Sequence, residues 1–263
     1  MYWRRLHSAY QPLTESRMYK RDKYTVAENT PLTSAVYRMR LEGDTEWITR
    51  PGQFVNIELE GLYLRRPISI CDWDEHSITI IYKVVGRGTE QMSRMAQGEV
   101  LDVLTGLGNG FNAEAECTAA LLVGGGVGVP PLYRLAKELL GRGRKVSVVL
   151  GFGTKAELFY EEEFRALGAD VYVSTADGSA GVKGFVTDAI REHNIAFDYF
   201  YACGPMPMLK ALSQSCEQSG ELSFEERMGC GFGACMGCSC KTLTGNKRIC
   251  KEGPVMRKEE ILW

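Results

Sequence analysis

The segment "TAALLVGGGVGVPPLYRLAKELLGRG" spans residues 118–143 and combines three patterns. "TAALLV" is typical of a buried parallel strand, "GGGVGVPP" is a glycine loop, and "LYRLAKELLGRG" has helical spacing. The same order recurs downstream, where "KVSVVLGFG" precedes "KAELFYEEEFRALG", "ADVYVSTADG" precedes "GFVTDAIREHN", and "FDYFYACGP" precedes "MPMLKALSQSCEQSG". This alternation predicts a doubly wound α/β domain over residues 114–221.

A different rhythm precedes this domain. "SAVYRMRLEG" and "QFVNIELE" alternate apolar and polar residues, and "SITIIYKVV" is a continuous β-branched run. Short strands at this spacing predict a small antiparallel β-barrel over residues 23–113. Residues 1–22 are charged and aperiodic, so we expect a loosely ordered arm there. The predicted fold class is a multidomain α+β protein.

The composition narrows the range of partners. The chain has 263 residues, with 31 basic against 33 acidic side chains and a formal net charge of -2. This balance predicts neither nucleic acid nor an anionic membrane surface as a partner. The first ten residues lack the apolar stretch of a signal peptide, and no apolar run is long enough to span a bilayer. We expect a soluble cytoplasmic protein.

Cysteines gather near the end of the chain, where "GCGFGACMGCSC" covers residues 229–240. Cys230, Cys235 and Cys238 have C-x4-C-x2-C spacing, and Cys250 follows after eleven residues. This spacing is typical of plant-type [2Fe–2S] ligation. The intervening glycines permit positive φ angles and bring backbone N–H groups close to the sulfurs. Residues 222–263 are therefore predicted to be a cluster-binding segment.

Other metal sites match this spacing less well. A four-cysteine zinc site usually has two C-x2-C pairs, and only Cys235 and Cys238 form one here. A [4Fe–4S] site would show two successive two-residue gaps. Cys240 is an alternative to Cys238 as a ligand, but C-x4-C-x4-C is not a known cluster spacing. We exclude Cys240 from the predicted ligand set.

Two segments of the predicted barrel suit a flavin nucleotide. In "RRPIS" (65–69), the Arg66 guanidinium can bind a diphosphate, and Ser69 can hydrogen-bond a ring edge. "IIYKVVGRGT" (80–89) ends in a glycine turn before a predicted helix, whose first N–H groups can hold phosphate. Each pattern alone is also that of a surface arginine or a plain turn.

Two loops of the α/β domain suit a second nucleotide. Gly124, Gly125, Gly126 and Gly128 let the backbone approach a pyrophosphate, although Pro131 replaces the third glycine of the usual dinucleotide fingerprint. "CGPMPML" (203–209) repeats this arrangement at another strand end. The alternatives are a tight turn into a helix and, for Cys203, a buried core thiol.

Acid–base machinery is not evident. The three histidines lie far apart in the sequence, and no nucleophile-elbow or Walker-type loop occurs. We therefore predict no catalytic acid–base residue.

Taken in order, the motifs resemble a known superfamily. "RPIS", "GRGT", "GGGVGVPPL" and "CGPMPML" resemble the flavin and nicotinamide motifs of the ferredoxin–NADP⁺ reductases. "FEERMGCGFGACMGCSC" with "RICKEGPV" resembles the C-terminal segment of dihydroorotate dehydrogenase B electron-transfer subunits. The resemblance covers residues 24–255. It implies a β-barrel FAD domain, an α/β NAD domain, a [2Fe–2S] tail and a partner catalytic subunit that carries FMN, together in a heterotetramer.

The resemblance also implies site residues. The implied FAD contacts are Arg66, Pro67, Ile68, Ser69, Ile81, Tyr82, Lys83, Gly88 and Thr89. The candidate NAD contacts are Gly124, Gly125, Gly126, Gly128, Cys203, Gly204 and Pro205. The implied cluster ligands are Cys230, Cys235, Cys238 and Cys250.

The implied function is that of an oxidoreductase subunit in pyrimidine biosynthesis. Electrons from dihydroorotate oxidation at the partner's FMN would pass through the cluster and FAD to NAD⁺. "GFGTK" (151–155) lacks an arginine for a 2′-phosphate, which favours NAD over NADP. One alternative is the small FAD/[2Fe–2S] subunit of a ferredoxin-dependent NAD(P)H transhydrogenase, or of a sulfide- or hydrogen-linked oxidoreductase. Another is a zinc-stapled interaction module.

Overall fold

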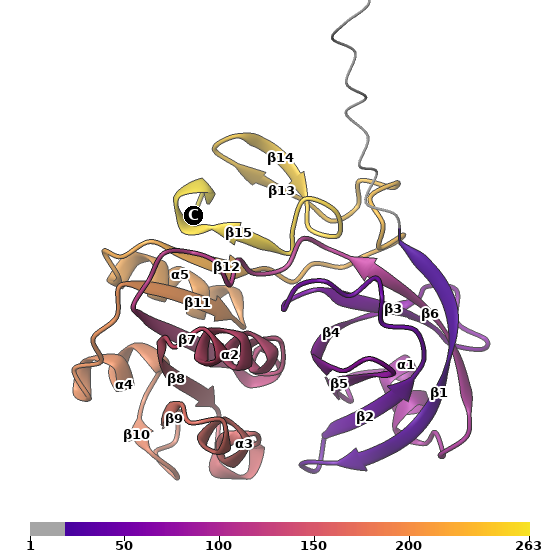
Figure 1. Ribbon diagram of the computed structural model, residues 1–263, viewed down its shortest axis with the longest axis horizontal. Helices are drawn as coiled ribbons and strands as arrows, with labels where there is room; N and C mark the ends of the chain where they lie inside the picture. The colour runs from indigo at the N-terminus through magenta and orange to yellow at the C-terminus, as the bar shows by residue number, and fades with distance from the viewer. Residues whose placement is uncertain (1–18) are drawn as a thin grey trace, which may run out of the picture.

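The computed structural model describes residues 19–263. Its first half is a closed barrel of six antiparallel strands in the order β1-β2-β5-β4-β3-β6 (Figure 1). The strands predicted from "SAVYRMRLEG", "QFVNIELE" and "SITIIYKVV" are confirmed as β2, β3 and β5. The barrel elements are β1 (Lys20–Pro31), β2 (Val36–Glu42), β3 (Phe54–Glu58), β4 (Arg66–Trp73), β5 (Ser77–Lys83), α1 (Arg87–Ser93) and β6 (Val100–Leu107).

The predicted N-terminal arm is wrong for residues 20–22, which belong to β1. Arg21 pairs with Leu104 in the antiparallel ladder between β1 and β6. The charged side chains that suggested an arm have partners on β6 and in the loop that follows β2. The Nε of Arg21 lies 2.9 Å from Asp102, and Lys20 binds Asp44. Residues 1–18, the rest of the predicted arm, lie outside the described residues.

The second half is a seven-stranded sheet in the order β10-β9-β8-β7-β11-β12-β15. Strands β7 to β11 follow the predicted strand–loop–helix units, so the doubly wound α/β domain is confirmed. Its elements are β7 (Ala119–Gly125), η1 (Gly126–Gly128), α2 (Pro131–Gly141), β8 (Lys145–Phe152), η2 (Lys155–Glu157), α3 (Glu161–Ala166), β9 (Asp170–Thr175), β10 (Val182–Lys183), α4 (Val186–Glu192), β11 (Tyr199–Cys203) and α5 (Met206–Ser215).

One predicted helix is broken. The sequence pattern predicts a continuous helix from "KAELFYEEEFRALG", but the chain forms a 3₁₀ turn, η2, and then the short helix α3. Tyr160 lies between them at φ 68° and is 7% exposed. Its ring packs edge-on against the Tyr133 ring of α2, with 5.1 Å between centroids. Burial of this aromatic ring explains the interruption.

The cluster-binding segment is integrated into the sheet rather than appended to it. β12 (Gly220–Ser223) runs parallel to β11, and β15 (Val255–Arg257) returns antiparallel to β12. The predicted boundary between residues 221 and 222 therefore falls inside a strand. Such short strands lack a periodic pattern that marks them in the sequence. Between them lies the hairpin of β13 (Ser239–Thr242) and β14 (Gly245–Arg248), and the chain ends beyond η3 (Lys258–Glu260).

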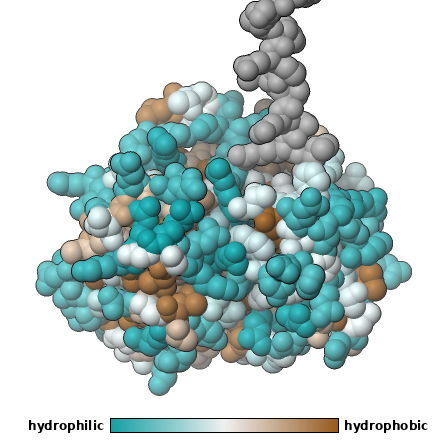
Figure 2. Space-filling view, viewed as in Figure 1, coloured by the Kyte–Doolittle hydropathy of each residue, from teal (hydrophilic) through white to brown (hydrophobic). Residues whose placement is uncertain are grey.

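Helix α2 holds the two halves together. The Arg134 guanidinium lies 4.1 Å from the ring centroid of Trp73 on β4, and the Nζ of Lys137 lies 2.6 Å from Asp72. Cation–π contacts and ion pairs of this kind fix β4 against the α/β domain. Hydrophilic residues cover most of the face in Figure 2. Among the described residues, no helix has both the length and the apolar character needed to cross a membrane.

Candidate functional site

Two of the predicted cluster ligands form a buried pair. The sulfurs of Cys238 and Cys250 lie 3.3 Å apart, and each residue is 2% exposed. The backbone N–H of Cys250 donates to the Cys238 sulfur at 3.5 Å. Burial, and then the neighbouring sulfurs of Cys238 and Cys230, raise the pKa of Cys250 to about 12. A metal that binds this thiol therefore displaces its proton.

The other two ligands lie on the open side of the loop. Cys230 is half-buried and Cys235 is exposed. Burial alone would raise the pKa of Cys230, but N–H groups that point at its sulfur outweigh this effect and lower the pKa to about 6. The N–H groups of Ala234 and Cys235 donate to that sulfur at 3.2 and 3.4 Å. Such donors also stabilise a metal-bound thiolate.

The arrangement fits a two-iron cluster. Within residues 19–263, no three His, Cys, Asp or Glu side chains lie close enough to hold a single metal ion. The four cysteines instead form the buried pair and the open pair, and a [2Fe–2S] cluster takes two thiolates on each iron. Cys240 is turned toward Met256, with 4.0 Å between the sulfurs. Its exclusion from the ligand set stays a prediction that agrees with this orientation.

The cluster-binding segment packs on the outer face of the barrel. Phe54 of β3 and Leu104 of β6 belong to the same buried apolar cluster as Cys238 and Cys250. Phe54 is also the cross-strand partner of Ser69, in the predicted flavin motif of β4. β4, which carries the predicted flavin motif, therefore pairs with the strand whose Phe54 shares an apolar cluster with two predicted cluster ligands.

Two of the predicted flavin residues, Arg66 of β4 and Gly88 of α1, lie against each other. A Cβ on Gly88 of α1 would lie 2.8 Å from the Arg66 Cζ, so the missing side chain leaves room for the guanidinium. The Thr89 hydroxyl accepts the Val85 N–H at 2.9 Å and so stabilises the turn before α1. The half-buried Arg66 beside a glycine-rich turn fits a diphosphate.

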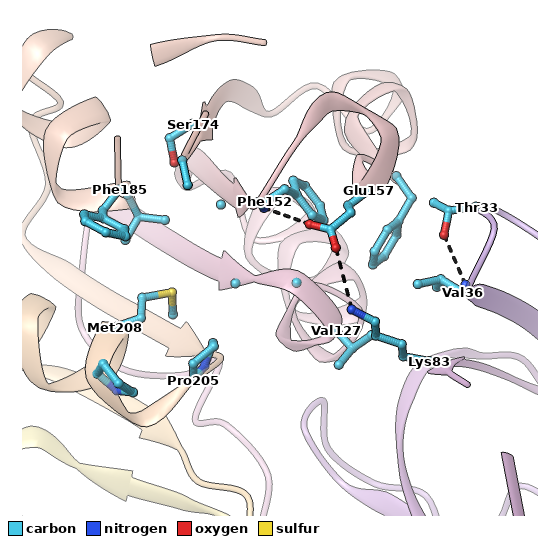
Figure 3. Close-up of a pocket in the computed structure, with 18 of the residues that line it drawn as sticks. Thr33, Val36, Lys83, Val127, Phe152, Glu157, Ser174, Phe185, Pro205 and Met208 are labelled. Atoms are coloured by element: carbon cyan, nitrogen blue, oxygen red, sulfur yellow. Dashed lines mark hydrogen bonds and ion pairs between the residues drawn. The ribbon is translucent and has the colours of Figure 1, made fainter. Parts of the chain in front are cut away.

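The remaining residues of the second flavin segment have different surroundings. Ile81 and Tyr82 are buried at 3% and 2% exposure, and the Tyr82 hydroxyl donates to Asn29 at 2.9 Å. Only the backbone of these two residues is left to face a ligand. Lys83 is exposed and lies across from Glu157, with 3.7 Å between Nζ and Oε1 (Figure 3).

A cavity of about 570 Å³ opens at the carboxyl ends of β7, β8, β9 and β11. In a doubly wound sheet, ligands bind at this edge. The barrel closes one side with residues 33–36 and Lys83. Of the seven predicted NAD residues, three line the cavity, namely Gly125, Gly126 and Pro205.

The other four do not line it. A Cβ on Gly128 would overlap the Cys203 carbonyl oxygen, and one on Gly124 would lie 2.8 Å from Val129. These glycines allow the loop to pack against β11 and the start of α2. Cys203 is 1% exposed, and burial raises its pKa. Gly204 would bring a Cβ to 2.7 Å from Met208, whose side chain lines the cavity.

Sequence reasoning missed several lining residues. Glu157 points into the cavity, and its Oε2 accepts the Gly153 N–H at 2.9 Å (Figure 3). Phe152, Ser174 and Phe185 line the walls. Phe152 and Ser174 lie at the carboxyl ends of predicted strands, which is the one signal that would have identified them.

Two family models match the chain. The oxidoreductase NAD-binding domain matches residues 122–214. The iron-sulfur cluster binding domain of dihydroorotate dehydrogenase B matches residues 225–262.

Known relatives match nearly the whole chain. The dihydroorotate dehydrogenase B (NAD(+)) electron transfer subunit of Geobacillus sp. strain WCH70 is 47% identical, over 93% of this chain and 100% of the relative. The subunit of the same name from Fusobacterium nucleatum is 46% identical, over 90% of this chain and 96% of the relative.

Solved structures share the fold. The NADH-dependent reduced ferredoxin-NADP oxidoreductase, described for flavin-based electron bifurcation, has a TM-score of 0.83 at 32% identity and covers 91% of this chain and 90% of its own. A ferredoxin NADP+ reductase from Neisseria gonorrhoeae with bound FAD and NADP has a TM-score of 0.65 at 16% identity, over 74% of this chain and 89% of its own, and supports the fold alone. The near-complete matches to curated relatives decide the assignment: the chain belongs to the family of dihydroorotate dehydrogenase B electron transfer subunits.

Proposed function

We propose that this chain is the NAD⁺-reducing electron-transfer subunit of a dihydroorotate dehydrogenase in pyrimidine biosynthesis. It holds FAD on the barrel, with Arg66 at the diphosphate, and a [2Fe–2S] cluster on Cys230, Cys235, Cys238 and Cys250. NAD⁺ binds in the cavity between the barrel and the α/β sheet. An FMN-containing catalytic subunit is the partner, in a heterotetramer located in the cytoplasm.

The observation that carries this proposal is the pairing of β3 with β4. Phe54 pairs with Ser69 of the flavin motif and packs in one apolar cluster with Cys238 and Cys250. Neighbouring strands are about 4.8 Å apart, so the chain presents both sites on one wall of the barrel. When bound, FAD exchanges electrons singly with an iron–sulfur centre and in pairs with a nicotinamide.

The chain's own residues bind and orient rather than transfer protons. Gly125, Gly126 and Pro205 line the cavity and leave backbone atoms exposed to a nucleotide. Phe152 and Phe185 supply apolar walls that exclude water from the ring. Cys203 is too buried to donate or accept a proton at the cavity surface. We assign the oxidation of dihydroorotate to residues of the partner.

A second candidate is the small subunit of a ferredoxin-dependent transhydrogenase. The match to the NADH-dependent reduced ferredoxin-NADP oxidoreductase covers almost the whole chain and favours it. Its 32% identity is lower than the 47% shared with the Geobacillus relative, so we rank it second.

The test is stopped-flow reduction of the bound FAD by dihydroorotate. The isolated chain is expected to pass electrons from NADH to artificial acceptors but to show no FAD reduction by dihydroorotate. Adding the FMN-containing catalytic subunit from the same organism is expected to produce rapid FAD reduction and NAD⁺-dependent turnover. Reduction in the isolated chain would refute the division of labour. No reduction in the complex would favour the transhydrogenase.

A further inference from the structure

Asn56 is a buried polar residue in the contact between the barrel and the cluster-binding segment. It lies on β3 and is 1% exposed. Its Nδ2 donates to the backbone carbonyl of Cys230 at 3.2 Å, across 174 positions of sequence. This bond fixes the backbone of one predicted cluster ligand directly to the barrel.

The contact is built from both sides. Gly231 follows Cys230 and has φ +78°, a left-handed conformation that favours glycine. A Cβ on Gly231 would overlap the Nδ2 of Asn56. The loop therefore needs glycine at this position both for its turn and for its close approach to the amide.

Asn56 is also fixed relative to the flavin motif. Its cross-strand partner on β4 is Pro67. Its own carbonyl accepts a hydrogen bond from the Nη1 of Arg65 at 3.2 Å. One residue thus joins the strand beside the flavin motif to a cluster ligand.

The amide is not explained by the stability of the fold. The Oδ1 of Asn56 is buried and has no hydrogen-bond partner among the described residues. A buried acceptor without a partner destabilises the folded state. A leucine of the same branching would avoid that loss but would leave the Cys230 carbonyl without its donor. Asn109 differs, since its Nδ2 donates to Glu252 and Val255 and its Oδ1 accepts from Val255.

We infer that Asn56 is a positioning residue, whose amide N–H holds the cluster loop at a set place on the barrel wall. The inference rests on the proposed cluster site but not on the identity of the partner subunit or on the direction of electron flow. If the purified wild-type protein contained no iron and sulfide, the proposed cluster site itself would be refuted before any variant is compared.

The test compares Asn56→Leu with wild type, purified with cluster and FAD. Loss of one neutral hydrogen bond is expected to speed iron release to a chelator by roughly two- to twelvefold. The electron paramagnetic resonance signal of the reduced cluster is expected to broaden, because the loop takes up more than one position. The thermal midpoint of the iron-free protein is expected to stay level or rise.

Two matched variants complete the experiment. Asn246→Leu makes the same change on the exposed strand β14 and is expected to leave iron release and the signal unchanged. Asn109→Leu removes fully paired hydrogen bonds and is expected to lower the thermal midpoint of the iron-free protein. Wild-type iron release and signal in Asn56→Leu would overturn the inference. A lowered midpoint with an unchanged signal would make Asn56 a structural residue only.

Discussion

The two glycine-rich loops of the molecule use glycine for different purposes. In the nicotinamide loop (residues 124–128), the lack of a side chain at Gly128 lets the backbone of β11 lie close by. The lack of one at Gly124 does the same for Val129. In the cluster loop (residues 229–237), a Cβ on Gly229 would instead lie 3.2 Å from the Cys235 sulfur. Gly231 in the same loop makes room for Asn56, so this loop is fitted both to a thiol and to the barrel, whereas Gly124 and Gly128 meet backbone atoms and apolar side chains. Repeated glycine in a sequence therefore does not by itself identify a ligand loop.

The largest effect is expected at Gly128. An alanine methyl would overlap the Cys203 carbonyl, and backbone on both sides cannot move away without displacing β11. We expect Gly128→Ala to destabilise the α/β domain by about 3 kcal/mol or more, the upper part of the range for overpacking. Urea unfolding, or the soluble yield where the variant does not fold, measures the loss.

Gly126→Ala is the matched control in the same loop. No atom lies within 4 Å of the position that its methyl group would take, and its φ of +54° is the remaining obstacle. A left-handed alanine is expected to lose about 1–2 kcal/mol. Equal losses of stability in Gly128→Ala and Gly126→Ala would contradict this comparison, because backbone packing would then not distinguish the two positions.

The cluster loop is expected to respond through its metal rather than its fold. Cys250→Ser removes the ligand that arrives from outside the loop, so iron and sulfide content should fall close to zero while FAD is retained. Cys240→Ser is the control, because that thiol faces Met256. Chemical analysis for iron and sulfide measures both. An emptied site in Cys240→Ser together with a filled one in Cys250→Ser would reverse the ligand assignment.

A glycine outside both loops extends the comparison to the barrel. Gly88 makes room for a side chain, Arg66, rather than for backbone or sulfur. Arg66→Ala is expected to weaken FAD binding by about 1.5–3 kcal/mol, the contribution of a charge-assisted hydrogen bond. Flavin content after dialysis measures this, and excess FAD should restore it.

Arg40→Ala is the control for Arg66, because within residues 19–263 the Arg40 side chain makes a single exposed ion pair, with Glu42 at 2.9 Å. It should keep its flavin. Stoichiometric FAD in dialysed Arg66→Ala would count against the assignment of Arg66 to the diphosphate.

Local patterns in the sequence predicted most of the fold. The spacing of Cys230, Cys235 and Cys238 is a property of one loop, so a cluster site can be recognised without tertiary information, while the ligand set itself stays a prediction. The longer strands carry enough periodic burial to be predicted, whereas β12 and β15 do not. Of the seven candidate NAD residues, Gly125, Gly126 and Pro205 line the cavity.

The remainder depends on contacts between distant segments. Lys20 and Arg21 belong to a strand that pairs with the distant β6, and Asp44 and Asp102 lie beside their side chains. Glu157 points into the cavity because the 3₁₀ turn η2 orients it, where the pattern predicts a longer helix. Asn56 gains its role from a partner 174 positions away. No window of sequence contains such information.

The pairing of β12 with β15 has a consequence for protein engineering. Ser223 and Val255 are paired in the antiparallel ladder, so residues 224–254 form a single connection between these two strands. A short designed turn joining these two strands would keep the sheet edge intact and delete the metal-binding module in a single step. The cluster-binding residues are, in topological terms, an insertion between two paired strands of a reductase sheet, and they also pack in one apolar cluster with Phe54 and Leu104 of the barrel.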